Sequence, residues 1–92
     1  MAILLPTSGF PQQVTPKHGG AFSLEELQAL VEGHLECVYL PDGRLLFLNE
    51  EGKCQGLPLN ALATALARPV LIPGDVIVGP AIVLTLQEAG EE

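Results

Sequence analysis

Hydrophobic residues in this chain form short runs that proline, glycine and polar turns separate. The first run, residues 2–5, has the length of a β-strand and stops at Pro6. Residues 10–16 are more polar and contain two prolines, which lack the N–H group that a central strand needs. The pattern therefore predicts a ragged opening hairpin whose second strand lies at a sheet edge.

The clearest helix signal lies between Phe22 and Gly33. Ser23 is a typical N-cap, and Glu26, three residues later, completes a capping box. Gly33 is the residue type that most often takes the left-handed position at the end of a helix. We therefore expect a helix over residues 24–32. Its apolar stripe, at helical spacing, is formed by Leu24, Leu27, Leu30 and Val31.

Two β-prone runs flank the turn residues 41–43 and predict a hairpin with strands at 35–40 and 44–49. The second of these strands is apolar without alternation, which indicates burial on both faces in the interior of a sheet. Tyr39 and Phe47 are expected to pack against each other across the hairpin, as core partners.

The rest of the chain predicts a second, shorter helix and a last strand. Asn60 is a suitable cap for a helix that Pro69 stops. The last strand covers residues 75–86, and Gly79 with Pro80 predicts a bend or bulge inside it. The residues that the second helix is expected to direct toward the core are Leu59, Leu62 and Leu66.

Together these elements predict a single α+β domain over residues 1–86, followed by a disordered acidic tail at 87–92. We expect a small mixed sheet of about five strands, with one main helix packed on one face and a second short helix beside it. The order of the elements matches a β-grasp (ubiquitin-like) domain.

Composition narrows the function classes. Only 16% of the residues are charged although 48% are hydrophobic, which favours exposed apolar surface and therefore a homo-oligomer. The net charge is −7 and the four basic residues are scattered singly, so we expect no binding of nucleic acid or of an anionic membrane. The opening residues lack the basic region of a signal peptide and their apolar run is too short for one, which predicts a cytoplasmic protein with reduced cysteines.

The densest group of polar residues is the stretch NEEGKCQGLPLN, residues 49–60. Its candidate binding residues, which carry carboxylates or amides, are Asn49, Glu50, Glu51 and Asn60. The competing interpretation gives local backbone roles to the same stretch. In that interpretation Asn49 ends a strand, Gly52 supplies a positive φ at a turn, and Asn60 caps the next helix. A catalytic carboxylate would also need a positioned partner, which the sequence does not indicate.

Metal and nucleophile chemistry have weak signals. Cys54 has no neighbouring histidine to activate it, and the chain has no Cys-x-x-Cys pair of the kind that marks a zinc site. Cys37 shares a strand face with Leu35 and Tyr39 and is expected to be a small core residue. Ser23, at a helix N-terminus, offers only a generic anion site. We therefore expect no catalytic residue, no metal and no cofactor.

The stretches LEELQALVEGHLECVYLPDGRLLFLNEEGKCQGLPLN and GDVIVGPAIVL together resemble a family of small uncharacterised proteins, domain of unknown function 3846. The likeness rests on a leucine-rich helix ending in Gly33, an apolar hairpin, an Asn-Glu-Glu-Gly turn, a Leu-Pro-x-Asn step and a closing Gly-x-x-x-x-Gly-Pro strand. It covers residues 1–86, and the alanine-rich 61–73 departs from it, since a more polar connection is expected there. The resemblance implies no activity, only a setting in phages, plasmids or bacterial accessory genes.

Two hypotheses about function follow. The first is a non-catalytic protein that works through protein–protein contacts, as an oligomer of itself or on another protein. The second is a small-ligand binder, or an enzyme, whose site forms at the 49–60 loop across a subunit interface. We favour the first because the chain lacks a catalytic set and has few charges.

Overall fold

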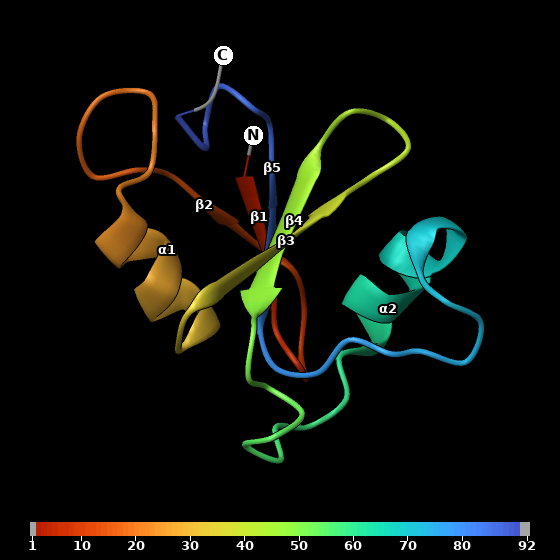
Figure 1. Ribbon diagram of the computed structural model, residues 1–92. Helices are drawn as coiled ribbons and strands as arrows, with labels where there is room; N and C mark the ends of the chain where they lie inside the picture. Colours follow the sequence, from red (N-terminus) through yellow and green to blue (C-terminus); the bar gives the residue numbers. More distant parts are fainter. Residues whose placement is uncertain (1, 91–92) are drawn as a thin grey trace.

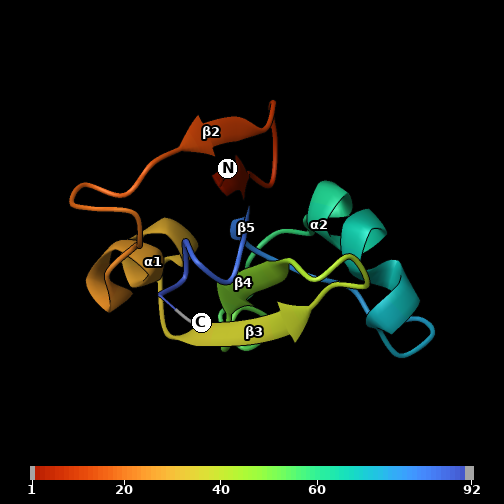
Figure 2. The same cartoon turned by 90° about the horizontal axis from the view of Figure 1, so that it is seen from above.

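The computed structural model describes residues 2–90; residues 1, 91 and 92 lie outside the described range. Within it, a five-stranded sheet and two α-helices form an α+β fold, which confirms the predicted class (Figure 1). The strand order is β2-β1-β5-β4-β3 (Figure 2). The strands are β1 (Ala2–Leu5), β2 (Gln12–Val14), β3 (Leu35–Tyr39), β4 (Leu45–Asn49) and β5 (Ala81–Leu84). The helices are α1 (Leu24–Val31) and α2 (Ala61–Ala67), and the short 3-10 helix η1 (Arg68–Val70) follows α2.

The sheet is covered on both faces, by α1 on one side and by α2 on the other (Figure 1). Leu45 and Phe47 of β4 belong to the apolar cluster under α1, whereas Leu46 and Leu48 belong to the cluster under α2. Every residue of β4 is buried. The apolar run therefore does form an interior strand, as the absence of alternation predicts.

The sheet is antiparallel at every pairing that the described residues form, so the expectation of a mixed sheet is wrong. For β4 and β5, the reason is the path of the chain between them. The chain leaves β4 at Asn49 and enters β5 at the same end of the sheet, because Phe47, near the end of β4, lies opposite Ile82, near the start of β5. A strand that re-enters at the end its neighbour left runs antiparallel to it. The β-grasp order is not confirmed.

Local signals fix α1. The Ser23 hydroxyl accepts a hydrogen bond from the Glu26 N–H (3.1 Å), and the Glu26 carboxylate accepts one from the Ser23 N–H (2.9 Å). This is the predicted capping box. The left-handed residue at the helix end is Glu32 (φ 65°), however, and not Gly33. Leu24 is 56% exposed, so it is not part of the buried stripe.

The second helix, α2, forms where the sequence predicts it but is rotated about its axis. Leu59 and Leu62 are exposed, and Leu66 is only partly buried. The side chains that face the core are Ala63, Thr64 and Ala67. Hydrogen bonds set this rotation: the Thr64 hydroxyl accepts from the Ile77 N–H (2.8 Å) and donates to the Ile77 carbonyl (3.3 Å). Small residues then face the sheet, which lets the helix approach closely.

Two strand predictions also need correction. Tyr39 is 65% exposed and lies opposite Leu45, while Phe47 lies opposite Cys37, so Tyr39 and Phe47 are not core partners. The last strand is β5 alone, because Gly79 takes a positive φ of 79° and breaks the run. The bend predicted at that glycine is confirmed.

The end of the described chain turns back onto α1. The Thr85 and Glu88 side chains each accept a hydrogen bond from the other residue's N–H, and the Glu88 carbonyl accepts one from the Phe22 N–H (2.7 Å). Ala89 packs against the cluster under α1. Glu88 and Ala89, which make these contacts, lie in the segment 87–92 that the sequence predicts to be a disordered tail. Residues 91 and 92 lie outside the described residues, and the disorder of the tail stays a prediction.

Candidate functional site

Asn49, the first predicted site residue, ends β4 and is 2% exposed. Its amide nitrogen donates to the carbonyls of Val31 (3.3 Å) and Glu32 (3.0 Å) and to the Gln55 side chain (3.2 Å). Its amide oxygen accepts from the Glu51 N–H (2.8 Å). The side chain therefore connects the carbonyls at the end of α1 to the 49–60 loop. It supplies these carbonyls with the hydrogen bonds that the helix backbone does not provide at its end.

The absence of a side chain at Gly33 leaves room for the Asn49 amide. A Cβ at Gly33 would lie 2.5 Å from the Asn49 amide nitrogen, which is closer than real Cβ atoms come. Glycine stands there because a side chain approaches the backbone, and not because the helix needs a positive φ at that residue. The same correction applies to Gly52, where a Cβ would lie 2.9 Å from a Val78 methyl carbon.

Asn60, the last residue of the predicted site, is fully buried away from the others. Its oxygen accepts from the Ala63 N–H (3.0 Å), which confirms the predicted cap of α2. Its amide nitrogen donates to the carbonyls of Leu5 (2.9 Å) and Gly79 (2.8 Å). One side chain thus joins β1, α2 and the approach to β5.

Glu50 and Glu51 form an exposed turn after β4. The hydrogen bonds of this turn use their backbones: the Glu50 N–H donates to the His34 carbonyl (2.8 Å), and the Glu51 carbonyl accepts from the Gln55 N–H (2.9 Å). These contacts close the loop without a contribution from either carboxylate. The local backbone interpretation of the stretch therefore accounts for the positions of Asn49, Glu50, Glu51 and Asn60.

A small cavity nevertheless opens beside this loop. Its volume is about 120 Å³, whereas sites for metabolites occupy roughly 300–1,000 Å³. Of the four predicted site residues, Asn49 and Glu50 line it, and Glu51 and Asn60 lie outside it. The lining comes from β3, from the 48–54 stretch and from the 71–78 stretch. Its residues are Glu36, Val38, Leu48, Asn49, Glu50, Lys53, Cys54, Leu71, Asp75, Val76, Ile77 and Val78.

An ion pair between Lys53 and Asp75 lies at this cavity. The Lys53 ammonium donates to the Asp75 carboxylate, which also accepts from the Val76 N–H (2.9 Å). The hydrogen bond from Lys53, then that from Val76, lowers the pKa of Asp75 below its usual value. The pair connects the 49–60 loop to the segment before β5. Sequence spacing gives no sign of it, since 22 residues separate the partners.

The N-terminus of α1 already has an anion from within the chain. The Glu26 carboxylate accepts from the N–H groups of Ser23 (2.9 Å) and Lys17 (2.9 Å). These hydrogen bonds, that of Ser23 first, lower the pKa of Glu26. The Glu26 carboxylate therefore occupies the Ser23 N–H, one of the donors at the generic anion site predicted there.

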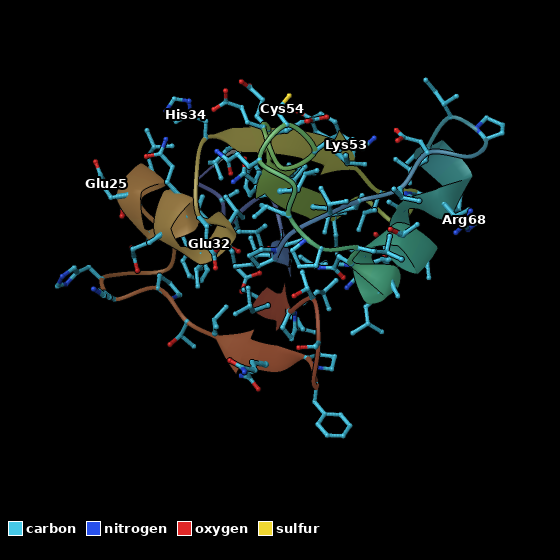
Figure 3. All side chains as sticks on the ribbon, turned by 90° about the horizontal axis from the view of Figure 1, so that it is seen from below. Glu25, Glu32, His34, Lys53, Cys54 and Arg68 are labelled. Atoms are coloured by element: carbon cyan, nitrogen blue, oxygen red, sulfur yellow. The ribbon has the colours of Figure 1, made fainter. Side chains whose placement is uncertain are left out.

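The cysteines and histidines do not gather. Cys54 is exposed at the cavity, while Cys37 is half-buried and packs against the cluster under α1. Figure 3 shows Cys54 and Lys53 on the loop beside β3, with His34 on the same side of the molecule. Among residues 2–90, no group of three or more His, Cys, Asp or Glu side chains could hold a metal ion. None of the helices in that range is long and apolar enough to cross a membrane.

Comparison with known families agrees with the motifs and their order. A family model with the description "Domain of unknown function (DUF3846)" matches residues 1–92, the whole chain. The chain belongs to the DUF3846 family. No curated protein and no solved structure shows significant similarity to the chain. The resemblance seen in the helix, hairpin and closing strand is thereby confirmed.

For this DUF3846 domain, the features that sequence reasoning missed are the Lys53–Asp75 pair and the orientation of α2. Both depend on contacts between distant segments. The sequence around α2 does differ from the rest of the chain in charge: residues 52–74 contain no aspartate or glutamate, although the chain has 11 of them. This stretch without carboxylates includes α2 and the segments on either side of it.

Proposed function

We propose that this DUF3846 domain is a non-catalytic interaction protein of the cytoplasm, which works as an oligomer and binds a partner protein through one apolar surface. The observation that carries the proposal is the exposure of large apolar side chains around α2. These residues, here called the α2 surface, are Leu59, Leu62, Val70 and Ile72. Ile72 is 77% exposed. These four residues lie close together in sequence, on α2 and on the segments next to it, and exposed apolar surface is typical of protein-binding sites.

The sequence of α2 itself supports an interface. The helix reads ALATALA and has no charged residue, although its outer side faces solvent. A helix that lies on the surface of a monomer ordinarily presents charged and polar residues to water. Because Ala63, Thr64 and Ala67 face the core, Leu62 and its apolar neighbours remain outside.

Charge indicates which partner fits. The residues 52–74 carry Lys53 and Arg68 and no carboxylate, while the whole chain has a net charge of −7. Lys53 is paired with Asp75, and Arg68 lies exposed at the end of α2 (Figure 3). The complementary partner is a different protein that offers an apolar groove with an acidic rim, because a second α2 surface would offer no carboxylate to Arg68.

The first hypothesis is preferred to a small-ligand site at the 49–60 loop of a single chain because the cavity beside that loop is small. A cavity of about 120 Å³ holds a few waters and falls below the size of metabolite sites. The Asn49 side chain makes four hydrogen bonds, two to the carbonyls at the end of α1 and two to Glu51 and Gln55 of the loop. A role in a phage, plasmid or accessory gene remains an expectation from the family, and it would make a host or phage protein the partner.

The test of the α2 surface uses two matched leucines. A photo-crosslinking residue at position 62 should capture a discrete partner in cells, and the same residue at position 24 should not. Leu24 is the control because it is an exposed leucine on α1, away from the α2 surface. The captured protein is then purified, and its affinity for the unmodified chain is measured by calorimetry.

In that assay, Leu62→Glu should weaken binding by about tenfold or more, because it places a carboxylate in an apolar contact that faces an acidic rim. Leu24→Glu should leave the affinity within about a factor of two, since the change lies outside the contact. Equal affinities for Leu62→Glu and the unmodified chain would contradict the proposal. So would an equal loss in both variants.

A further inference from the structure

The two edges of the sheet differ in how they are protected. At one edge, β2 is three residues long and polar, and Pro11 and Pro16 flank it. At the other edge, β3 is five residues long, contains no proline, and has Glu36 as its one charge (Figure 2). Short strands, prolines and charges are the usual means of preventing edge-to-edge pairing. The β2 edge is short and flanked by prolines, whereas the β3 edge is longer and has only the charge of Glu36.

Hydrogen bonds at the two ends of the hairpin show which backbone groups of β3 point outward. The Leu40 N–H donates to the Arg44 carbonyl (2.9 Å), and the His34 carbonyl accepts from the Glu50 N–H (2.8 Å). Residues 34 and 40 therefore pair directly with the chain of β4. Because the direction alternates along an antiparallel strand, the backbone N–H groups of Leu35 and Tyr39 are directed away from β4.

We propose that a second copy of this chain pairs with β3 in antiparallel fashion, with the two-fold axis at Cys37. The inference rests on the oligomeric part of the proposed function and assigns it a surface, separate from the α2 surface. In this register Leu35 of one copy lies opposite the partner's Tyr39, and Glu36 lies opposite the partner's Val38. The five residues of β3 are then fully matched, and the sheet continues across the axis.

Charge and the length of β3 favour this register over the two registers in which the axis lies at Glu36 or at Val38. An axis at Glu36 would place the two Glu36 carboxylates directly opposite each other, which destabilises a strand pair. An axis at Val38 would extend past β3 and place Leu35 opposite the partner's Pro41, which lacks an N–H group. The axis at Cys37 avoids both. It also provides a contact for Tyr39, whose side chain is 65% exposed in one copy.

The register predicts a specific thiol contact. Two Cys37 residues at the axis would have Cα atoms about 5.5 Å apart, the spacing of a directly opposed hydrogen-bonded pair. A short bismaleimide should therefore link Cys37 to Cys37 in the Cys54→Ser variant at low micromolar protein. The Cys37→Ser variant, which retains Cys54, is the control. Random collision would favour Cys54, because it is the more exposed thiol; efficient linking through Cys37 and not through Cys54 therefore indicates the proposed pairing.

Amide hydrogen exchange on the unmodified chain gives a second test that needs no variant. The N–H groups of Leu35 and Tyr39 should exchange at least tenfold more slowly at high protein concentration than after dilution. The N–H of Gln13, on the β2 edge, should show no such dependence. Fast exchange at both concentrations would overturn the inference, as would crosslinking through Cys54 alone.

These outcomes are separable from those of the proposed function. A dimer whose mass persists while Leu35 and Tyr39 exchange fast would remove β3 as the interface and leave an oligomer in place. A monomer at every concentration would overturn the β3 pairing and the oligomeric part of the proposed function together. Binding of the partner at the α2 surface is decided independently by the Leu62→Glu variant.

Discussion

Replacing Asn60 by alanine should lower the free energy of unfolding by about 3–5 kcal/mol, the largest effect that we expect from a single substitution. The change removes three hydrogen bonds at a fully buried site. The carbonyls of Leu5 and Gly79 and the N–H of Ala63 lose their partner. Each unsatisfied buried group costs about 1–3 kcal/mol, and a domain has only about 5–15 kcal/mol in total.

Urea denaturation followed by circular dichroism measures this loss. Gln13→Ala is the matched control, because it removes an exposed amide from the edge strand β2, and we expect a change within about 0.5 kcal/mol. If Asn60 were a ligand-binding residue without a structural role, Asn60→Ala would unfold at the same urea concentration as the unmodified chain. That outcome would contradict the structure's account of Asn60.

Replacing Asn49 by alanine should lower the free energy of unfolding by about 2–4 kcal/mol. The reason is that its side-chain amide donates to two carbonyls at the end of α1, which lie 18 and 17 residues away in sequence. The carbonyls of Val31 and Glu32 would lose a donor, and the Glu51 N–H would lose an acceptor. We also expect faster amide exchange in the last turn of α1 and in the 49–60 loop, since Asn49 joins the two.

The Asn49→Asp variant tests the hydrogen bonds that the Asn49 amide donates, without a change in the size of the side chain. Aspartate has the shape of asparagine but presents an oxygen to the two carbonyls, so it should destabilise the fold nearly as much as alanine at neutral pH. Burial beside carbonyls raises the pKa of such a carboxyl, so part of the stability should return as the pH falls and the group becomes a donor. A stable Asn49→Asp protein at neutral pH would show that the amide nitrogen contributes little.

Features that depend on neighbouring residues could be predicted from the sequence. The capping box of Ser23 and Glu26, the hairpin around residues 41–43 and the break at Gly79 each depend on a few consecutive residues. Asn60 was correctly predicted as a helix cap because its bond to the Ala63 N–H spans three residues. The family, too, follows from the order of such local motifs.

Features that depend on distant contacts could not be predicted. Because leucine is more hydrophobic than alanine, a hydrophobic pattern places Leu59 and Leu62 in the core. The hydrogen bonds between Thr64 and Ile77 nevertheless turn the alanines of α2 inward. Tyr39 is β-prone and apolar enough for a core position, but its place on an edge strand leaves it exposed. The Asn60 bond to Leu5 spans 55 residues and the Lys53–Asp75 pair spans 22, which no local pattern encodes.

If this protein acts through contacts with other protein chains, a native mass spectrum of the purified protein should show the mass of a homodimer of the 9.7 kDa chain, with no added mass. Dilution should convert that dimer to monomer without residual adducts. A monomer that carries a stoichiometric metal or small molecule would instead make the 49–60 loop and the cysteines the functional site, and would exclude a role based on protein contacts alone.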